Sequence, residues 1–93
     1  MSQTAVRREV YFHGRVQGVG FRQTTYELAR KFRGVGFVQN LPDGRVLLTA
    51  EGEPEELDRF VAGIVAAMGR RVAGYDTDET PARGNFHDFT IQY

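Results

Sequence analysis

The alternation of apolar and polar side chains near the start of the chain predicts a β-strand over residues 6–13. Successive side chains of a strand point to opposite faces, so Val10 and Phe12 are expected together on its buried face. Residues 1–5 are mostly small or polar and are expected to form a loose start.

Apolar side chains recur at spacings of three and four residues in two later stretches, which predicts two amphipathic helices. The first is expected to begin at Phe21 and to end at Gly34, a typical C-cap residue. The second is expected to begin at Pro54, a favoured first helical residue, and to end at Gly69. The two apolar stripes are Phe21, Thr25, Leu28, Ala29 and Phe32, and Leu57, Phe60, Val61, Ile64 and Met68.

The remaining apolar stretches predict further strands. Residues 35–40 and 45–51 form a predicted hairpin around a turn at residues 41–44, whose proline and glycine stand at favoured positions. A terminal strand is expected at residues 89–93. After the second helix the pattern is weak, and it allows an edge strand over residues 70–75 followed by a polar loop.

The order of these elements predicts the fold class. A strand, a helix, two strands, a second helix, a possible extra edge strand and a final strand are typical of an α+β two-layer sandwich, with both helices on one face of a mostly antiparallel sheet. If the first two strands are parallel and joined by a right-handed helical crossover, their carboxyl ends lie at the same edge of the sheet. Asn40 ends the second strand, so it is expected beside the loop that follows the first.

That loop is rich in glycine, with Gly14, Gly18 and Gly20 within seven positions. Glycine adopts the positive φ values that turn several backbone N–H groups toward one point, and a helix N-terminus adds further unpaired N–H groups. An oxyanion such as phosphate is the natural occupant. Arg22 lies in the first helical turn and adds a planar cation that matches a phosphoryl group. The candidate anion-binding loop consists of Arg15, Val16, Gln17, Gly18, Val19, Gly20 and Phe21.

Composition narrows the possibilities. The 93 residues suit a single domain, and the 12 basic and 12 acidic side chains give a net charge of zero, which counts against a general nucleic-acid binder. The absence of cysteine excludes disulfides and thiolate zinc sites, and His13 and His87 lack metal-ligand spacing, so no metal or cofactor is expected. No apolar run approaches the length of a membrane span, and residues 1–9 lack the apolar core of a signal peptide. A cytoplasmic monomer without membrane partners is expected.

Two motifs resemble those of a known family. Residues 14–22 read Gly-Arg-Val-Gln-Gly-Val-Gly-Phe-Arg, which resembles the signature loop of the acylphosphatases. Residues 36–46 resemble their second signature, in which an asparagine, here Asn40, precedes an aspartate-glycine turn. Residues 89–93 resemble the C-terminal strand of the family. The resemblance therefore extends over nearly the whole chain.

The resemblance implies a ferredoxin-like βαββαβ sandwich that hydrolyses the carboxyl–phosphate anhydride of small acyl phosphates without a metal. It also implies that Arg22 and the loop amides bind the phosphoryl group, while Asn40 positions the attacking water. The chemistry agrees, because the leaving group is the carboxylate of an acid with a pKa of about 4 and needs no proton donor at neutral pH. A phosphate ester requires a general acid or a metal, and neither is evident beside the loop.

Two other functions remain open from the sequence. The first is a non-catalytic module that binds phosphate or carbamoyl phosphate. The second is an RNA-recognition-like binder, because residues 33–38 partly match the aromatic strand motif of such domains. In that comparison Val35 and Asn40 fall where stacking aromatic residues are required, so the match is poor.

Overall fold

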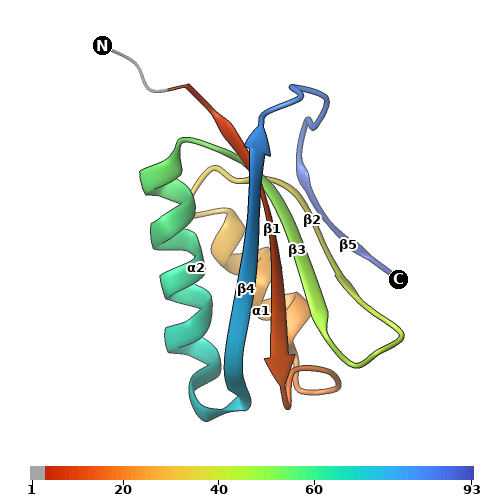
Figure 1. Cartoon of the computed structure of the whole chain (residues 1–93). Helices are drawn as coiled ribbons and strands as arrows, with labels where there is room; N and C mark the ends of the chain where they lie inside the picture. The colour runs from red at the N-terminus through yellow and green to blue at the C-terminus, as the bar shows by residue number, and fades with distance from the viewer. Residues whose placement is uncertain (1–3) are drawn as a thin grey trace.

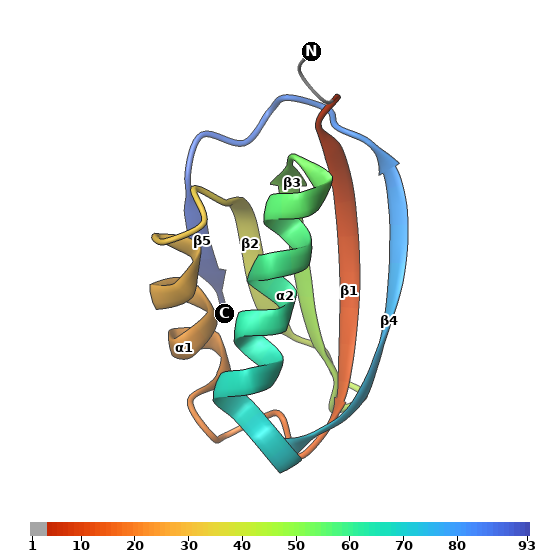
Figure 2. The ribbon, with the colours of Figure 1, turned by 90° about the vertical axis from the view of Figure 1, so that its left-hand side faces the viewer.

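Two helices pack on one face of a five-stranded sheet in the computed structural model, which describes residues 4–93 (Figures 1 and 2). The α+β sandwich expected from the sequence is confirmed. Of the expected loose start, residues 1–3 lie outside the described residues, and Thr4 and Ala5 precede the first strand. The elements are β1 (Val6–Gly14), α1 (Phe21–Ala29), β2 (Val35–Asn40), β3 (Val46–Gly52), α2 (Pro54–Met68), the 3₁₀ turn η1 (Gly69–Arg71), β4 (Val72–Pro81) and β5 (Phe89–Gln92).

The sheet order β4-β1-β3-β2-β5 sets the position of the strand ends. β3 is antiparallel to both β1 and β2, so β1 and β2 run in the same direction, as expected, although β3 lies between them. Val46 of β3 pairs with Phe12 on one side and with Asn40 on the other. Asn40 therefore lies level with Phe12, two residues before β1 ends at Gly14 and the glycine-rich loop continues.

The core lies between the sheet and the two helices. Val10 and Phe12 of β1 are 1% and 0% exposed, so the predicted inward face of this strand is confirmed. Phe60 of α2 is fully buried, and its ring lies 5.9 Å from that of Phe32 and 5.7 Å from that of Phe89. Aromatic pairs at these distances add to the free energy of burial. The predicted stripe of α2 is buried throughout, at Leu57, Phe60, Val61, Ile64 and Met68.

The end of α1 differs from the prediction. The helix stops at Ala29, and Gly34 is not its C-cap residue. The left-handed residue is Arg33, with φ of 50°, and the amide of Gly34 donates to the carbonyl of Ala29 at 3.2 Å. A left-handed residue followed by such a long-range bond is typical of a Schellman-like end. The glycine at position 34 thus indicated the right turn, but the C-cap residue is Arg30, four residues earlier than predicted.

The strand after α2 is also longer than expected. β4 covers Val72–Pro81, so the prediction of an edge strand at residues 70–75 followed by a polar loop was wrong in its bounds. β4 pairs with β1 along its whole length, and its residues from Tyr75 onward are exposed. An edge strand whose two faces are both largely exposed does not need alternating apolar residues. The hydrophobic pattern therefore did not predict the full length of β4.

The connection from β4 to β5 crosses from one edge of the sheet to the other (Figure 2). It passes the end of the sheet opposite to the glycine-rich loop (Figure 2). β5 then pairs with β2 in parallel, which brings the last residues of the chain back toward Asn40. Within residues 4–93 the structure contains no helix that is both long and apolar enough to cross a membrane.

Candidate active site

A pocket of about 140 Å³ lies where the glycine-rich loop, the start of α1, the end of β2 and the C-terminal residues meet. Pockets for drug-sized ligands typically measure about 300–1,000 Å³, so this one suits a small chemical group. It brings together Arg22 and Asn40, which are 18 residues apart in the sequence. The lining residues are Val16, Gly18, Gly20, Phe21, Arg22, Gln23, Asn40, Ile91 and Tyr93.

The loop backbone has the conformation that glycine makes accessible. Gly18 and Gly20 have φ values of 75° and 80°, and Gly20 is the N-cap residue of α1. A side chain at either position would meet no atom within 4 Å, so glycine is needed there for conformation rather than for space. Gly14 is different, because a Cβ atom there would lie 2.4 Å from the carbonyl oxygen of Arg71.

The amides of the loop are largely available. Within residues 4–93 the structure records no hydrogen bond from the backbone N–H groups of residues 16–23. The amide of Arg15 is an exception, because it donates to the carbonyl of Arg71 at 2.8 Å, and the Arg15 side chain is exposed. The first turn of α1 contains no acidic residue that would compensate the partial positive charge of its N-terminus. This segment therefore favours an anion.

Apolar contacts fix the loop in place. Val16 is 1% exposed and Phe21 is 2% exposed, and the Phe21 ring packs against that of Phe12 at 5.0 Å. Val19 is partly buried against the same core. The free amides are thus held by side chains that are themselves part of the hydrophobic core.

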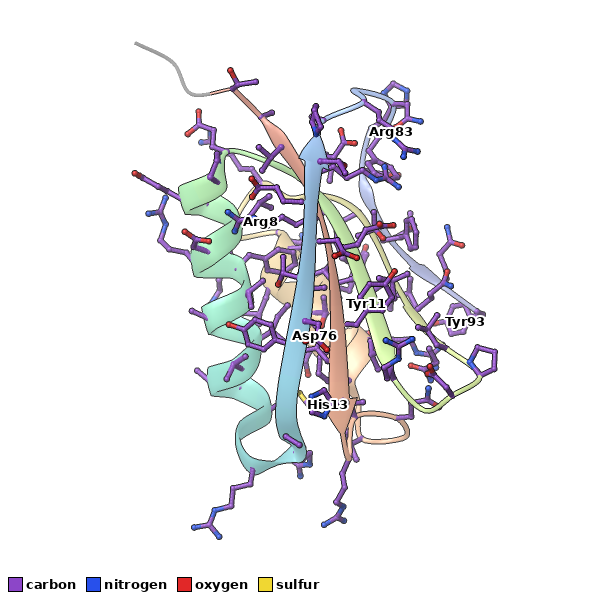
Figure 3. All side chains as sticks on the ribbon, viewed as in Figure 1. Arg8, Tyr11, His13, Asp76, Arg83 and Tyr93 are labelled. Atoms are coloured by element: carbon purple, nitrogen blue, oxygen red, sulfur yellow. The ribbon has the colours of Figure 1, made fainter. Side chains whose placement is uncertain are left out.

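Arg22 projects from the first turn of α1 into this pocket. Its Nη1 atom lies 3.5 Å from the carbonyl oxygen of Gln92, and its guanidinium carbon lies 4.8 Å from the centre of the Tyr93 ring. Tyr93 follows β5 and lies near the β2–β3 turn (Figure 3). No ion pair is recorded for Arg22 among the described residues. A cation without a carboxylate, placed at a helix N-terminus, favours a negatively charged ligand.

Asn40 supplies a buried polar atom at the same pocket. Its Oδ1 atom is buried and has no hydrogen-bond partner within the described residues. Buried acceptors in proteins are nearly always paired with protein groups or with water. The Asn40 side chain therefore suits a water molecule or a donor on a ligand.

Gln17 lies in the loop but its side chain does not line the pocket. Its Nε2 atom donates to the carbonyl oxygens of Leu41 and Arg45, at 2.8 and 2.9 Å. Sequence reasoning placed Gln17 in the anion-binding loop and did not foresee this bond. It also missed Gln23, Ile91 and Tyr93, because the parallel pairing of β5 with β2 leaves no signal in the local pattern.

Larger hollows lie elsewhere on the molecule. One of about 540 Å³ lies between the turn after α1 and the start of α2, and its lining includes Lys31, Glu53 and Leu57. No residue of its lining has a buried side-chain atom that lacks a hydrogen-bond partner. The smaller pocket does have such an atom, the Oδ1 of Asn40. We therefore place the candidate active site in the smaller pocket. No group of three or more His, Asp or Glu side chains in the described part of the chain is arranged to hold a metal ion.

An α+β sandwich with free loop amides, a helix N-terminus and an arginine without a recorded ion pair around one small pocket has the features of a protein that binds phosphoryl groups. Comparisons with known proteins then identify the family. A family model described as Acylphosphatase matches residues 8–91. An acylphosphatase of Archaeoglobus fulgidus is 50% identical over 86 residues, which cover 91% of this chain and 96% of the relative. An acylphosphatase of Rubrobacter xylanophilus is 41% identical over 87 residues, 92% of this chain and 79% of the relative.

Solved structures agree with the sequence relatives. The crystal structure of acylphosphatase from Bacillus subtilis has a TM-score of 0.87 at 34% identity, covering 95% of this chain and 99% of that chain. The chain therefore belongs to the acylphosphatase family, enzymes that hydrolyse small acyl phosphates. The resemblance drawn from the two sequence motifs is confirmed.

Proposed function

We propose that this chain hydrolyses acyl phosphates by in-line attack of a water molecule held by Asn40, acting as a monomer with one catalytic domain. The phosphoryl group is bound by Arg22 and by the loop amides of residues 16–22. The observation that carries the proposal is that one pocket brings together free amides, the unpartnered Asn40 Oδ1 atom and a guanidinium for which no ion pair is recorded among the described residues.

The phosphoryl group of an acyl phosphate carries two negative charges near neutral pH. Arg22 contributes a full positive charge, and the N-terminus of α1 contributes about half an elementary charge. The amides add hydrogen bonds that are already oriented before the substrate arrives. Phosphoryl transfer depends mainly on such positioning and on stabilisation of charge at the phosphoryl oxygens.

The reaction needs few other groups. The water oxygen forms a bond to phosphorus while the bond from phosphorus to the acyl oxygen breaks, and the acyl oxygen leaves with the electron pair as a carboxylate. Both protons of the water remain on the phosphate product, one on the new oxygen and one transferred to a phosphoryl oxygen, so the products are a carboxylate and dihydrogen phosphate. The pocket lining contains no Asp, Glu or His side chain, and a carboxylate leaving group requires no general acid.

Two substitutions test the proposed roles. Arg22→Ala should raise the inhibition constant for inorganic phosphate and lower kcat/KM for benzoyl phosphate by about 10²–10³-fold, as is typical for loss of one preorganised donor. Asn40→Ala should lower kcat by a similar factor and leave phosphate inhibition nearly unchanged. The matched controls are Arg30→Ala, an exposed arginine that caps the other end of α1, and Asn85→Ala, an exposed asparagine in the β4–β5 connection.

Assays are run with and without a chelator. Full turnover of Asn40→Ala, or equal effects of Arg22→Ala and Arg30→Ala, would contradict the assigned roles. A requirement for an added divalent metal would contradict the metal-free route.

The aromatic side chains on the outer face of the sheet argue against the alternative function, RNA binding. The guanidinium of Arg45 lies 4.8 Å from the centre of the Tyr11 ring, and the Phe37 ring contacts that of Phe86 at 6.0 Å. Stacking of bases on a sheet requires free aromatic faces, and these two rings already have partners.

A further inference from the structure

The side chain of Gln17 joins two parts of the site that are distant in the sequence. Its carboxamide nitrogen donates to the carbonyl oxygens of Leu41 and Arg45, at 2.8 and 2.9 Å. A carboxamide NH₂ group has two hydrogen atoms, so both are used in these bonds. The amide of Leu41 also donates to the Arg45 carbonyl, at 2.8 Å, which closes the β2–β3 turn on itself.

The two ends of this contact belong to the two halves of the proposed reaction. Gln17 lies in the loop that carries the free amides and that leads directly into Arg22. Leu41 follows Asn40, the last residue of β2. The Gln17 bonds therefore connect the loop that binds the phosphoryl group with the strand end that holds the water. No other side chain of the loop is recorded with a hydrogen bond among the described residues.

In-line attack depends on the distance between these two halves. The nucleophile must approach phosphorus opposite to the leaving oxygen, and a misplacement of about 1 Å can cost about 10²-fold in rate. The loop is anchored to the core through Val16 and Phe21, whereas Asn40 is held by the pairing of β2 with β3. These anchors are linked through β3, because Val46 pairs with both Phe12 and Asn40, whereas the Gln17 bonds join the loop directly to the turn that follows Asn40. The direct bonds therefore fix the relative placement of the two segments that catalysis requires.

We propose that the side chain of Gln17 is a positioning group that sets the placement of Asn40 relative to the phosphate-binding loop, and that this side chain touches neither the phosphoryl group nor the water. This inference rests on the proposed role of Asn40. It gives the Gln17 side chain a role that is separate from that of the loop backbone amides.

A double-mutant cycle tests the inference. Gln17→Met has nearly the same size as the natural side chain and no donor. We expect kcat for benzoyl phosphate to fall by roughly 10–100-fold, with the inhibition constant for inorganic phosphate changed by less than about threefold. In an Asn40→Ala background the same substitution should change kcat by less than about twofold, because the group through which Gln17 acts is already absent. Gln39→Met is the matched control, since Gln39 lies on the opposite face of β2 from Asn40 and outside the pocket.

Several results would overturn the inference. These are a wild-type kcat for Gln17→Met, an equal loss in the Asn40→Ala background, and a rise in the phosphate inhibition constant that parallels the loss of kcat. If Gln17→Met does not fold in a thermal melt, Gln17→Asn keeps the carboxamide but is one methylene shorter, and it should show the same split between kcat and phosphate inhibition. Full activity of Asn40→Ala would refute the proposed function itself. A slow Asn40→Ala with a fully active Gln17→Met would refute only the role of Gln17.

Discussion

Glu51 is a buried carboxylate that binds the connection between β4 and β5. It lies on the outer face of β3 and is 5% exposed. The backbone amides of Arg83 and Gly84 donate to its two oxygens at 3.0 Å each, and Arg7 pairs with it at 3.3 Å. Arg83 lies in the connection between β4 and β5, at the end of the sheet away from the pocket (Figure 3). The Glu51 side chain therefore fastens residues 83 and 84, which lead into β5, to β3.

The substitution Glu51→Gln keeps the shape and removes the charge. A glutamine offers one acceptor oxygen, so one of the two backbone amides loses its acceptor, and Arg7 loses its counter-charge although its side chain is only 11% exposed. A hydrogen bond to a charged group contributes about 1.5–3 kcal/mol, and removal of one partner of a buried ion pair costs about 3–5 kcal/mol. Because one amide bond is retained, we expect a loss of about 3 kcal/mol, or about 12–24 °C in Tm for a domain of this size.

Chemical and thermal denaturation at pH 7 measure this loss. Glu79→Gln is the matched control, because Glu79 pairs with Arg8 at 2.8 Å but its side chain is 49% exposed. An exposed ion pair contributes at most about 1 kcal/mol. If the two variants are equally stable, burial and amide bonding at Glu51 add nothing to the free energy of unfolding beyond an exposed ion pair, and the reasoning fails.

The pH dependence gives a second measurement on the same residue. Burial by itself raises the pKa of the Glu51 carboxyl, but the amides of Arg83 and Gly84 and the guanidinium of Arg7 outweigh it and hold the pKa below its ordinary value. A carboxyl whose pKa is lower in the folded state stabilises the protein fully above its unfolded pKa of about 4.3 and loses this contribution as the pH falls through the folded pKa. The stability difference between wild type and Glu51→Gln should therefore shrink below about pH 4. A difference that stays constant from pH 7 to pH 3 would contradict the assignment.

Two further predictions concern backbone crowding and the C-terminal residue. Gly36→Ala should destabilise the protein by more than about 4 kcal/mol in urea unfolding, because its Cβ atom would lie 1.9 Å from the carbonyl oxygen of Thr49 on the neighbouring strand. Gly44→Ala, also at positive φ but with nothing within 4 Å, should cost only about 1–2 kcal/mol, and equal losses would refute the crowding argument. Tyr93→Ala should raise KM by no more than about fivefold, because Tyr93 is 96% exposed and an exposed cation–π contact is worth about 1 kcal/mol at most. A larger increase would show that the Tyr93 ring takes a direct part in substrate binding.

Hydrophobic patterning predicted the elements that bury one face, and it failed where burial is weak. β1, β2 and α2 were placed within one residue of their ends because their apolar side chains enter the core. β4 has no such pattern, since its stability comes from backbone pairing with β1 rather than from buried side chains. The end of α1 was misplaced because Arg33 adopts a left-handed conformation for which glycine is the usual choice.

The candidate site was predictable only in part. The common direction of β1 and β2 follows from the strand–helix–strand order, so the proximity of Asn40 to the loop could be deduced before any coordinates were known. The parallel pairing of β5 with β2 depends on the whole sheet order, and no local pattern indicates it. The sequence therefore did not predict that Ile91 and Tyr93 line the site, and only the structure shows it.

The loop motif divides its tasks among neighbouring residues, and this division explains why the amides can be left without partners. Val16 and Phe21 are buried in the core, Gln17 bonds to the β2–β3 turn, and Gly18 and Gly20 adopt the positive φ values. Each of these contacts restrains the backbone without using the N–H groups of residues 16–23. An anion site whose donors are fixed before the ligand arrives pays little reorganisation cost in the transition state. The rigidity needed for catalysis is thus supplied by core packing, by the Gln17 side chain and by glycine conformation, while the backbone N–H groups of the same residues stay available for the phosphoryl group.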